Sequence, residues 1–241
     1  MSIALQHTAT ALDFSGSTVS SLGASAFSLG TGNLVFVDVR WGVDSAPTLS
    51  ITDTAGNSYT LIDSHWDSVA TQGCATFYAK NTTANASNVV TANFTGGSQK
   101  YVMVVAAEYS GLSTTSPLDQ HAITDSSGAS NQTIASGSFT TTSASEVLIS
   151  VGFTSGGNGA DFTADTGYTV EAQLIDTGQR YGALQDKIVS SIQTGVTATL
   201  TSSSSNLWLH ALATFKAGNG ASKLVPTNKL RPRIFSPGLA R

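Results

Sequence analysis

The most site-like cluster of side chains in the chain lies at residues 63–67, where the sequence DSHWD places two carboxylates, an imidazole and an indole within five positions. Such a cluster could stack a sugar on Trp66 or hold a cation between its carboxylates. Short polar stretches between apolar runs are also typical of solvated hairpin tips, and we favour that interpretation. Two further aromatic residues, Trp41 and Tyr181, join Trp66 as candidate glycan contacts.

Patterns that support catalysis or metal binding are missing from the sequence. The four histidines are His7, His65, His121 and His210, and no pair has the spacing of metal ligands. No nucleophile elbow, phosphate-binding loop or dinucleotide-binding motif is present. Three acids in strand-like runs, Asp38, Glu108 and Asp186, could form a glycosidase pair, but outward or rim positions explain them equally well. We therefore predict a protein that is not an enzyme, with no catalytic residue, no metal and no cofactor.

The composition is that of a folded chain with a neutral, hydroxyl-rich surface. Charged residues make up 11% and hydrophobic residues 40% of the 241 residues, and Ser, Thr, Asn and Gly fill the stretches between apolar runs. This surface is typical of extracellular or virion proteins. Cys74 is the only cysteine, which excludes a disulfide within the chain and indicates a small buried residue.

The first residues, MSIALQHTATALDFSGS, show neither the cationic start nor the apolar run of a secretory signal. A surface suited to the outside and a start without an export signal are reconciled in a phage structural protein, which is made in the host cytoplasm and released by lysis. A secreted protein expressed without its native signal would reconcile them equally well.

Period-two alternation dominates the sequence and predicts β-strands. VTANFT at 90–95 and VTATLT at 196–201 each place apolar residues on one face and mainly hydroxyls on the other. Other runs are apolar on both faces, which indicates central strands or strands that meet a partner. These runs cover 34–41, 101–109, 147–153 and 207–215. We expect ten to fourteen strands.

The strand-like runs recur in the same order in two parts of the chain. LVFVDVRWG, SYTLID, FYAK and VTANFT are followed later by VLISVGF, GYTVEAQLID, LQDK and VTATLT. We predict an all-β, antiparallel, jelly-roll-like β-sandwich built from two internally repeated halves and an extended C-terminal arm. Residues 1–32 form an extended segment or strand, 33–216 the duplicated body with halves 33–110 and 146–216, and 111–145 the linker. Two separate domains are the alternative.

The last segment, 217–241, differs in kind from the rest of the chain. It holds five of the eleven basic residues, three of the five prolines and none of the fifteen acidic residues. Proline and the absence of an apolar period argue against independent folding. A disordered terminus is one interpretation, but we favour an arm that binds a neighbouring subunit. Nucleic-acid binding is not expected, because the cations lack interleaved aromatic residues. The candidate partner-binding residues are Lys223, Lys229, Arg231, Arg233, Ile234, Phe235, Leu239 and Arg241.

Several motifs in the body resemble a β-sandwich module found in tailed-phage virion proteins and bacterial surface proteins. They are SITDTAGNSYTLI (50–62), FYAKN (77–81), EYSGLSTTSPLD (108–119), TGYTV (166–170) and ALATFKAG (211–218). The closing RPRIFSPGLAR is similar to C-terminal tails of phage structural proteins. The resemblance implies a β-sandwich and carries no catalytic residue.

These observations predict a non-enzymatic structural component of a tailed-phage virion, displayed on the virion surface. The expected role is a capsid decoration, cement or fibre-like protein that forms a homo-oligomer and binds other virion proteins through its arm. No membrane contact is expected. The alternative is a glycan-binding or host-adhesion module of a phage tail or bacterial surface, and a polysaccharide hydrolase comes third.

Overall fold

The computed structural model describes residues 2–43, 47–97, 99–159 and 161–218, and the regular elements found in them are β-strands. All eight candidate partner-binding residues of the arm lie outside these ranges. The described ranges contain eighteen strands, more than the ten to fourteen expected. They hold no helix long and apolar enough to cross a membrane.

The first repeat consists of three antiparallel sheets. Its five-stranded sheet has the order β1 (Ala4–Asp13), β10 (Lys100–Ser110), β4 (Leu34–Gly42), β7 (Gln72–Lys80) and β6 (Thr60–Asp67). A three-stranded sheet has the order β2 (Ser21–Gly23), β9 (Val90–Thr95) and β5 (Thr48–Asp53). A two-stranded sheet pairs β3 (Phe27–Leu29) with β8 (Asn85–Asn88).

The second repeat has the same strand order. Its five-stranded sheet runs β11 (Leu118–Asp125), β18 (Trp208–Lys216), β13 (Glu146–Asn158), β16 (Gln179–Val189) and β15 (Thr169–Asp176). Its three-stranded sheet runs β12 (Asn131–Ala135), β17 (Thr199–Asn206) and β14 (Thr163–Ala164). Each of these eight strands therefore has a counterpart in the first repeat, in the same sheet position.

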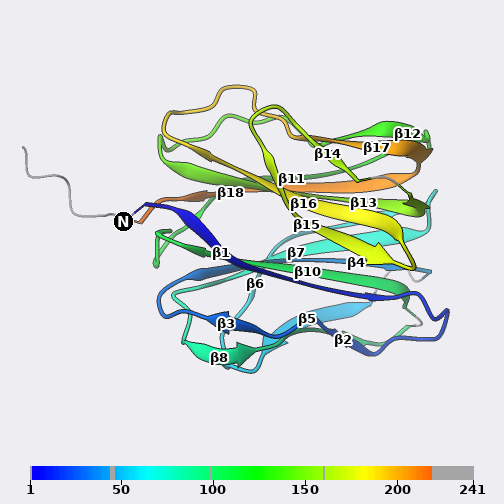
Figure 1. Cartoon of the computed structure of the whole chain (residues 1–241), viewed down its shortest axis with the longest axis horizontal. Coiled ribbons are helices and arrows are strands. Elements are labelled where there is room, and N and C mark those ends of the chain that lie inside the picture. Colours follow the sequence, from blue (N-terminus) through cyan, green and yellow to red (C-terminus); the bar gives the residue numbers. More distant parts are fainter. Residues whose placement is uncertain (1, 44–46, 98, 160, 219–241) are drawn as a thin grey trace, which may run out of the picture.

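The sheets stack in four layers (Figure 1). The two five-stranded sheets form the inner layers and face each other, and each repeat covers the other face of its inner sheet with its own small sheets. One apolar cluster lies inside the first sandwich and two lie inside the second. A fourth lies between the repeats, where Phe215 of β18 packs edge-on against Phe36 and Tyr78 of the first repeat. The all-β sandwich class expected from the sequence is confirmed, while jelly-roll connectivity stays a prediction.

The four runs that are apolar on both faces are central strands. In β4, Val35, Val37 and Val39 face the core of the first sandwich, whereas Leu34 and Phe36 face the core between the repeats. Successive side chains of a strand point to opposite faces, so a strand between two cores must be apolar throughout. Contact with a partner subunit was the other expectation for these runs, but both of their faces are covered by the chain itself.

Strands lie on both sides of the expected halves. Residues 111–145, the expected linker, contain β11 and β12, and residues 1–32, the expected extended segment or strand, contain β1, β2 and β3. Strand β11 escaped detection because it is an edge strand whose residues are nearly all half-buried, which leaves no clear alternation. Each repeat is therefore longer than the halves 33–110 and 146–216.

Candidate functional site

Two of the three aromatic glycan candidates lie side by side in the first repeat. Trp41 on β4, Gly73 on β7 and Trp66 on β6 occupy the same row across three neighbouring strands. A Cβ atom on Gly73 would lie 2.5 Å from Cζ2 of Trp41 and 3.0 Å from Cε3 of Trp66. The glycine therefore provides the space in which the two indoles approach the sheet surface and each other.

The two indoles line an open pocket of about 380 Å³. Most of the lining residues are apolar, Ser64 and His65 are the polar ones, and Trp41 is 5% exposed while Trp66 is half-buried. The other lining residues are Pro47, Leu49, Leu61, Ser64, His65, Ala75 and Phe77. Apolar walls with a few polar groups are the usual composition of a small-molecule site, and aromatic faces suit the C–H faces of a sugar ring.

We expected the cluster at residues 63–67 to be a hairpin tip, but it forms the second half of strand β6. Alternation along the strand sends Asp63 and His65 toward the second repeat and Trp66 toward the pocket. His65 Nε2 lies 2.6 Å from Oδ2 of Asp125, and Oδ2 of Asp63 lies 3.3 Å from Nδ1 of His121. Asp63 and His65 thus connect the two repeats. Of this cluster, the indole of Trp66 is the main group that remains for a ligand.

The environment of Asp125 favours its ionised form. Burial acts against the charge, but hydrogen bonds from His65 and from the backbone and hydroxyl of Ser127 outweigh it and lower the pKa of Asp125 below its ordinary value. The carboxylate therefore stays charged at neutral pH and holds the imidazole across the interface between the repeats.

Tyr181, the third glycan candidate, lies in a different pocket. Its ring stacks on Phe14 at 4.3 Å between ring centroids, and Phe14 also lies 5.9 Å from Tyr101. These rings, with Arg40, Ser155, Gly156 and Gly157, line a pocket of about 250 Å³ that combines residues of both repeats. The structure thus brings Trp41 and Trp66 together and separates Tyr181 from them.

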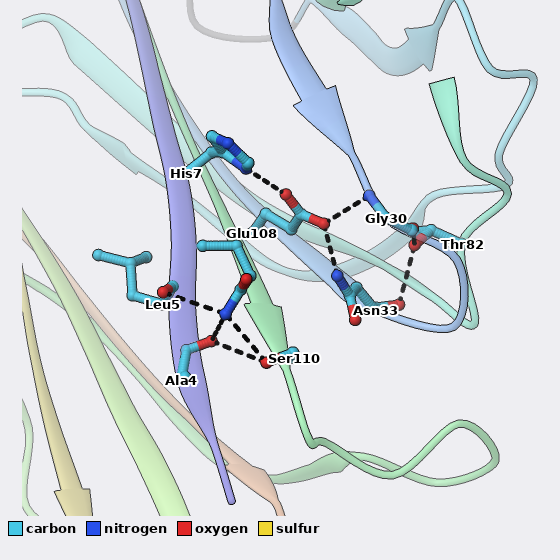
Figure 2. A network of polar contacts seen from close by, with 9 residues as sticks. Ala4, Leu5, His7, Gly30, Asn33, Thr82, Glu108 and Ser110 are labelled. Carbon is cyan, nitrogen blue, oxygen red and sulfur yellow. Dashed lines mark hydrogen bonds and ion pairs between the residues drawn. The ribbon is translucent and has the colours of Figure 1, made fainter. Parts of the chain in front are cut away.

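The three acids that could have formed a glycosidase pair bind different partners. Glu108 accepts hydrogen bonds from the backbone N–H of Gly30 at 2.8 Å and from Nδ2 of Asn33 at 2.6 Å, and its other oxygen lies 2.7 Å from Nδ1 of His7 (Figure 2). Asp186 accepts from the hydroxyl of Tyr109 at 2.8 Å, across the two repeats. Asp38 accepts from the hydroxyl of Thr76 at 2.9 Å. Each acid thus belongs to a separate structural network.

Two other candidate groups are buried inside the protein. Cys74 is 1% exposed, and desolvation raises the pKa of its thiol well above the ordinary value, so it is a structural residue, as expected. His210 is fully buried, its Nε2 lies 2.6 Å from the hydroxyl of Ser150, and burial lowers its pKa to about 3. The imidazole is therefore neutral at physiological pH.

Sequence reasoning missed most of the residues that make the aromatic pocket. Leu49, Leu61 and Phe77 come from three different strands, so no local pattern joins them. The one available signal was Gly73, because a glycine inside an otherwise apolar strand indicates the close approach of another group. Within the described ranges no group of three or more His, Cys, Asp or Glu side chains could hold a metal ion.

Comparison with known proteins identified no relative of this chain. No family model, curated protein or solved structure matches the chain.

Proposed function

We propose that the protein is a non-enzymatic structural component of a tailed-phage virion, a capsid decoration, cement or fibre-like surface protein anchored by its C-terminal arm and assembled as a homo-oligomer. The observation that supports this function best is the apolar core shared by the two sandwiches. A protein that reinforces or decorates a particle must resist deformation, and two sandwiches joined through a common core form a stiff body.

The place where the arm leaves the body is held by the second repeat and the connection between repeats. The backbone N–H of Ala217 donates to the carbonyl of Ser145 at 2.9 Å, and that of Gly218 donates to the carbonyl of Gly111 at 2.8 Å. A tether that starts from a held position restricts the volume its end can search, which raises its effective concentration at a neighbouring subunit. This geometry suits attachment through residues 219–241.

Deletion of residues 219–241 tests the proposal. The truncated protein should unfold at the same temperature as the full chain, because the hydrogen bonds of Ala217 and Gly218 remain, and it should be lost from purified particles. Two full-length variants separate the contributions within the arm. One replaces the five cations with Gln, and the other replaces Ile234, Phe235 and Leu239 with Ala. Full particle occupancy by the truncated protein would contradict arm-mediated attachment.

A second candidate function is glycan binding, as in an adhesion module of a phage tail or bacterial surface. The pocket formed by Trp41 and Trp66 supports it. On a glycan array, Trp66→Ala should abolish binding, whereas Tyr181→Ala, in the other pocket, should leave neutral glycans bound. Array signals that do not change in Trp66→Ala would rule out this pocket as the binding site.

A further inference from the structure

We propose that the 250 Å³ pocket between the repeats binds the carboxylate of an acidic sugar residue through Arg40, with Phe14, Tyr101 and Tyr181 as its aromatic walls. This inference deepens the glycan-binding candidate, because it names a ligand class and a second site. The aromatic pocket formed by Trp41 and Trp66 does not depend on it.

Arg40 is a cation in an unusual position, because it lines the pocket and yet is only 5% exposed. Its Nη2 donates to Oε1 of Gln72 at 2.8 Å, its Nε donates to the same oxygen at 3.3 Å, and its Nη1 donates to the carbonyl of Tyr101 at 3.0 Å. A guanidinium carries five N–H groups. These contacts leave one N–H on each Nη for a ligand, which is the number that a bidentate carboxylate requires.

The charge of Arg40 has no counter-ion in the part of the chain that the structure describes. Its acceptors are an amide and a backbone carbonyl, both neutral, and none of the ion pairs of the described residues includes it. Asp38, two positions away on the same face of β4, bonds to Thr76 instead, and burial raises its pKa and favours its uncharged form. Burial lowers the pKa of Arg40 only to about 10, so the guanidinium stays charged at neutral pH.

A buried charge without a counter-ion is costly, and an anion that enters the pocket would offset this cost. Nε2 of Gln72, whose oxygen binds the guanidinium, is buried and has no hydrogen-bond partner, and the same is true of the acceptors Oδ1 of Asp38 and Oδ2 of Asp67. The case for an anion therefore rests on the two unused N–H groups and the uncompensated charge of Arg40. A carboxylate supplies both the two acceptors and the negative charge, whereas a neutral sugar hydroxyl supplies no charge.

The backbone next to Arg40 is shaped around the guanidinium. The pairing of β10 with β4 shifts between Lys100 and Met103, which is a β-bulge, and Tyr101 in this bulge has φ of 54°. A residue other than glycine in this region costs on the order of 1–3 kcal/mol and is found preferentially at functional sites. The bulge turns the carbonyl of Tyr101 to the guanidinium of Arg40 and leaves the Tyr101 ring 40% exposed at the pocket.

The opposite wall comes from the second repeat and suits a small ring. Ser155, Gly156 and Gly157 lie on β13. A Cβ atom on Gly157 would lie 2.7 Å from Cβ of Gln179 and 3.1 Å from Cζ of Tyr181, so the glycine lets Tyr181 lie against the strand. At about 250 Å³ the pocket is below the usual size of sites for drug-sized ligands, which favours one sugar residue over an oligosaccharide.

Isothermal titration of the full-length protein with D-glucuronate, D-glucose and acetate at constant ionic strength tests the proposal. We expect glucuronate to bind at least ten-fold more tightly than glucose, which lacks the carboxylate, and than acetate, which lacks the ring. Arg40→Gln should weaken glucuronate binding at least ten-fold. Arg180→Gln is the matched control, because it removes the same charge from a side chain that pairs with Asp161 at 2.6 Å, and it should bind glucuronate normally.

Ser155→Phe keeps the test decisive if Arg40→Gln fails to fold. Ser155 is exposed at the pocket, so a phenyl ring there should block the site at an unchanged unfolding temperature. Equal affinity for glucuronate and glucose, or normal glucuronate binding by Ser155→Phe, would overturn the proposal. Competition by inorganic sulfate as strong as that by glucuronate would show a general oxyanion site and overturn the assignment to sugars. Loss of neutral-glycan binding in Trp66→Ala concerns the other pocket and leaves this result unaffected.

Discussion

His65 of the first repeat and Asp125 of the second repeat lie 2.6 Å apart, and Asp63 and His121 form a second pair, 3.3 Å apart, between the same two strands. Strand β6 thus contributes an acid and a base, and β11 contributes the complementary base and acid. The arrangement ties the edges of the two inner sheets together at both positions.

Asp125→Asn should lower stability near neutral pH by about 1 kcal/mol or less, because the pair is partly exposed. The folded state lowers the pKa of Asp125, so its contribution is present above the ordinary Asp pKa of about 4 and is lost as pH falls below it. Thermal unfolding between pH 2 and 7 measures both effects. Asp13→Asn is the control, since Asp13 accepts the same turn hydrogen bonds from Ser15, and it should leave the cross-repeat contribution intact.

Phe215→Ala should destabilise the protein by about 3–5 kcal/mol, because it opens a cavity in the core between the repeats. Since this core belongs to both repeats, unfolding in urea should remain a single transition that shifts as a whole. Phe162→Ala, in the core of the second sandwich alone, provides the comparison. Two separate transitions in the wild-type protein would mean that the repeats fold as independent domains.

Glu146 should make stability decrease as pH rises toward neutrality. Burial, followed by the neighbouring carboxylate of Asp119, raises the pKa of Glu146 to about 7. A folded-state pKa above the unfolded value of about 4.3 means that the folded protein binds more protons in this window, so the stabilisation is complete below pH 4.3 and is lost by about pH 7. Glu146→Gln should flatten the curve of unfolding temperature against pH over that range. An unchanged slope in this variant would assign the effect to another group.

Gly73→Ala should disturb the aromatic pocket at a cost of about 1–3 kcal/mol, because the added methyl group would overlap Trp41 and press on Trp66. Tryptophan fluorescence should shift, since both indoles must move. Gly159→Ala is the matched control, because a Cβ atom at Gly159 meets nothing within 4 Å. Identical spectra and stabilities for Gly73→Ala and the wild type would show that the indoles do not rest on the glycine.

The strands with clear alternation could be predicted from the sequence. In β9, Val90, Ala92 and Phe94 are buried and the residues between them are not, as the period of VTANFT indicates. In its counterpart VTATLT, Ala198 and Leu200 are buried as expected, although strand β17 begins only at Thr199. These positions could be predicted because one face meets a core and the other does not.

Register was harder to predict than the strands themselves. Matching FYAK with LQDK makes Lys80 equivalent to Lys187. In the structure, Lys80 pairs with Leu34, whereas Val147, the counterpart of Leu34, pairs with Ile188. The true counterpart of Lys80 is therefore Ile188, one residue further along the chain. A shift by one residue reverses the faces of a strand. Matching the two lysines by sequence could not reveal the one-residue shift, because the register of a strand is set by partner strands that lie far away in the chain.

The start of the second repeat had a signal that was overlooked. Asp13-Phe14-Ser15-Gly16 and Asp125-Ser126-Ser127-Gly128 end β1 and β11 with the same turn, in which the aspartate accepts from the serine backbone two positions later at 2.9 and 2.7 Å. The pockets gave no such signal, because their walls come from strands distant in sequence. Arg40 could be seen in the sequence as one of two charged residues, with Asp38, in an apolar run, but its burial depends on the second repeat.

The contacts between the inner sheets are reciprocal, since β1 lies against β15 and its counterpart β11 lies against β6, the counterpart of β15. Such a contact has the isologous form of a two-fold homodimer, here contained within a single polypeptide. Fusion makes the association unimolecular, so it does not weaken on dilution. It also allows the two copies to diverge, and a pocket such as that of Arg40, which takes different residues from each copy, can exist only once in the molecule.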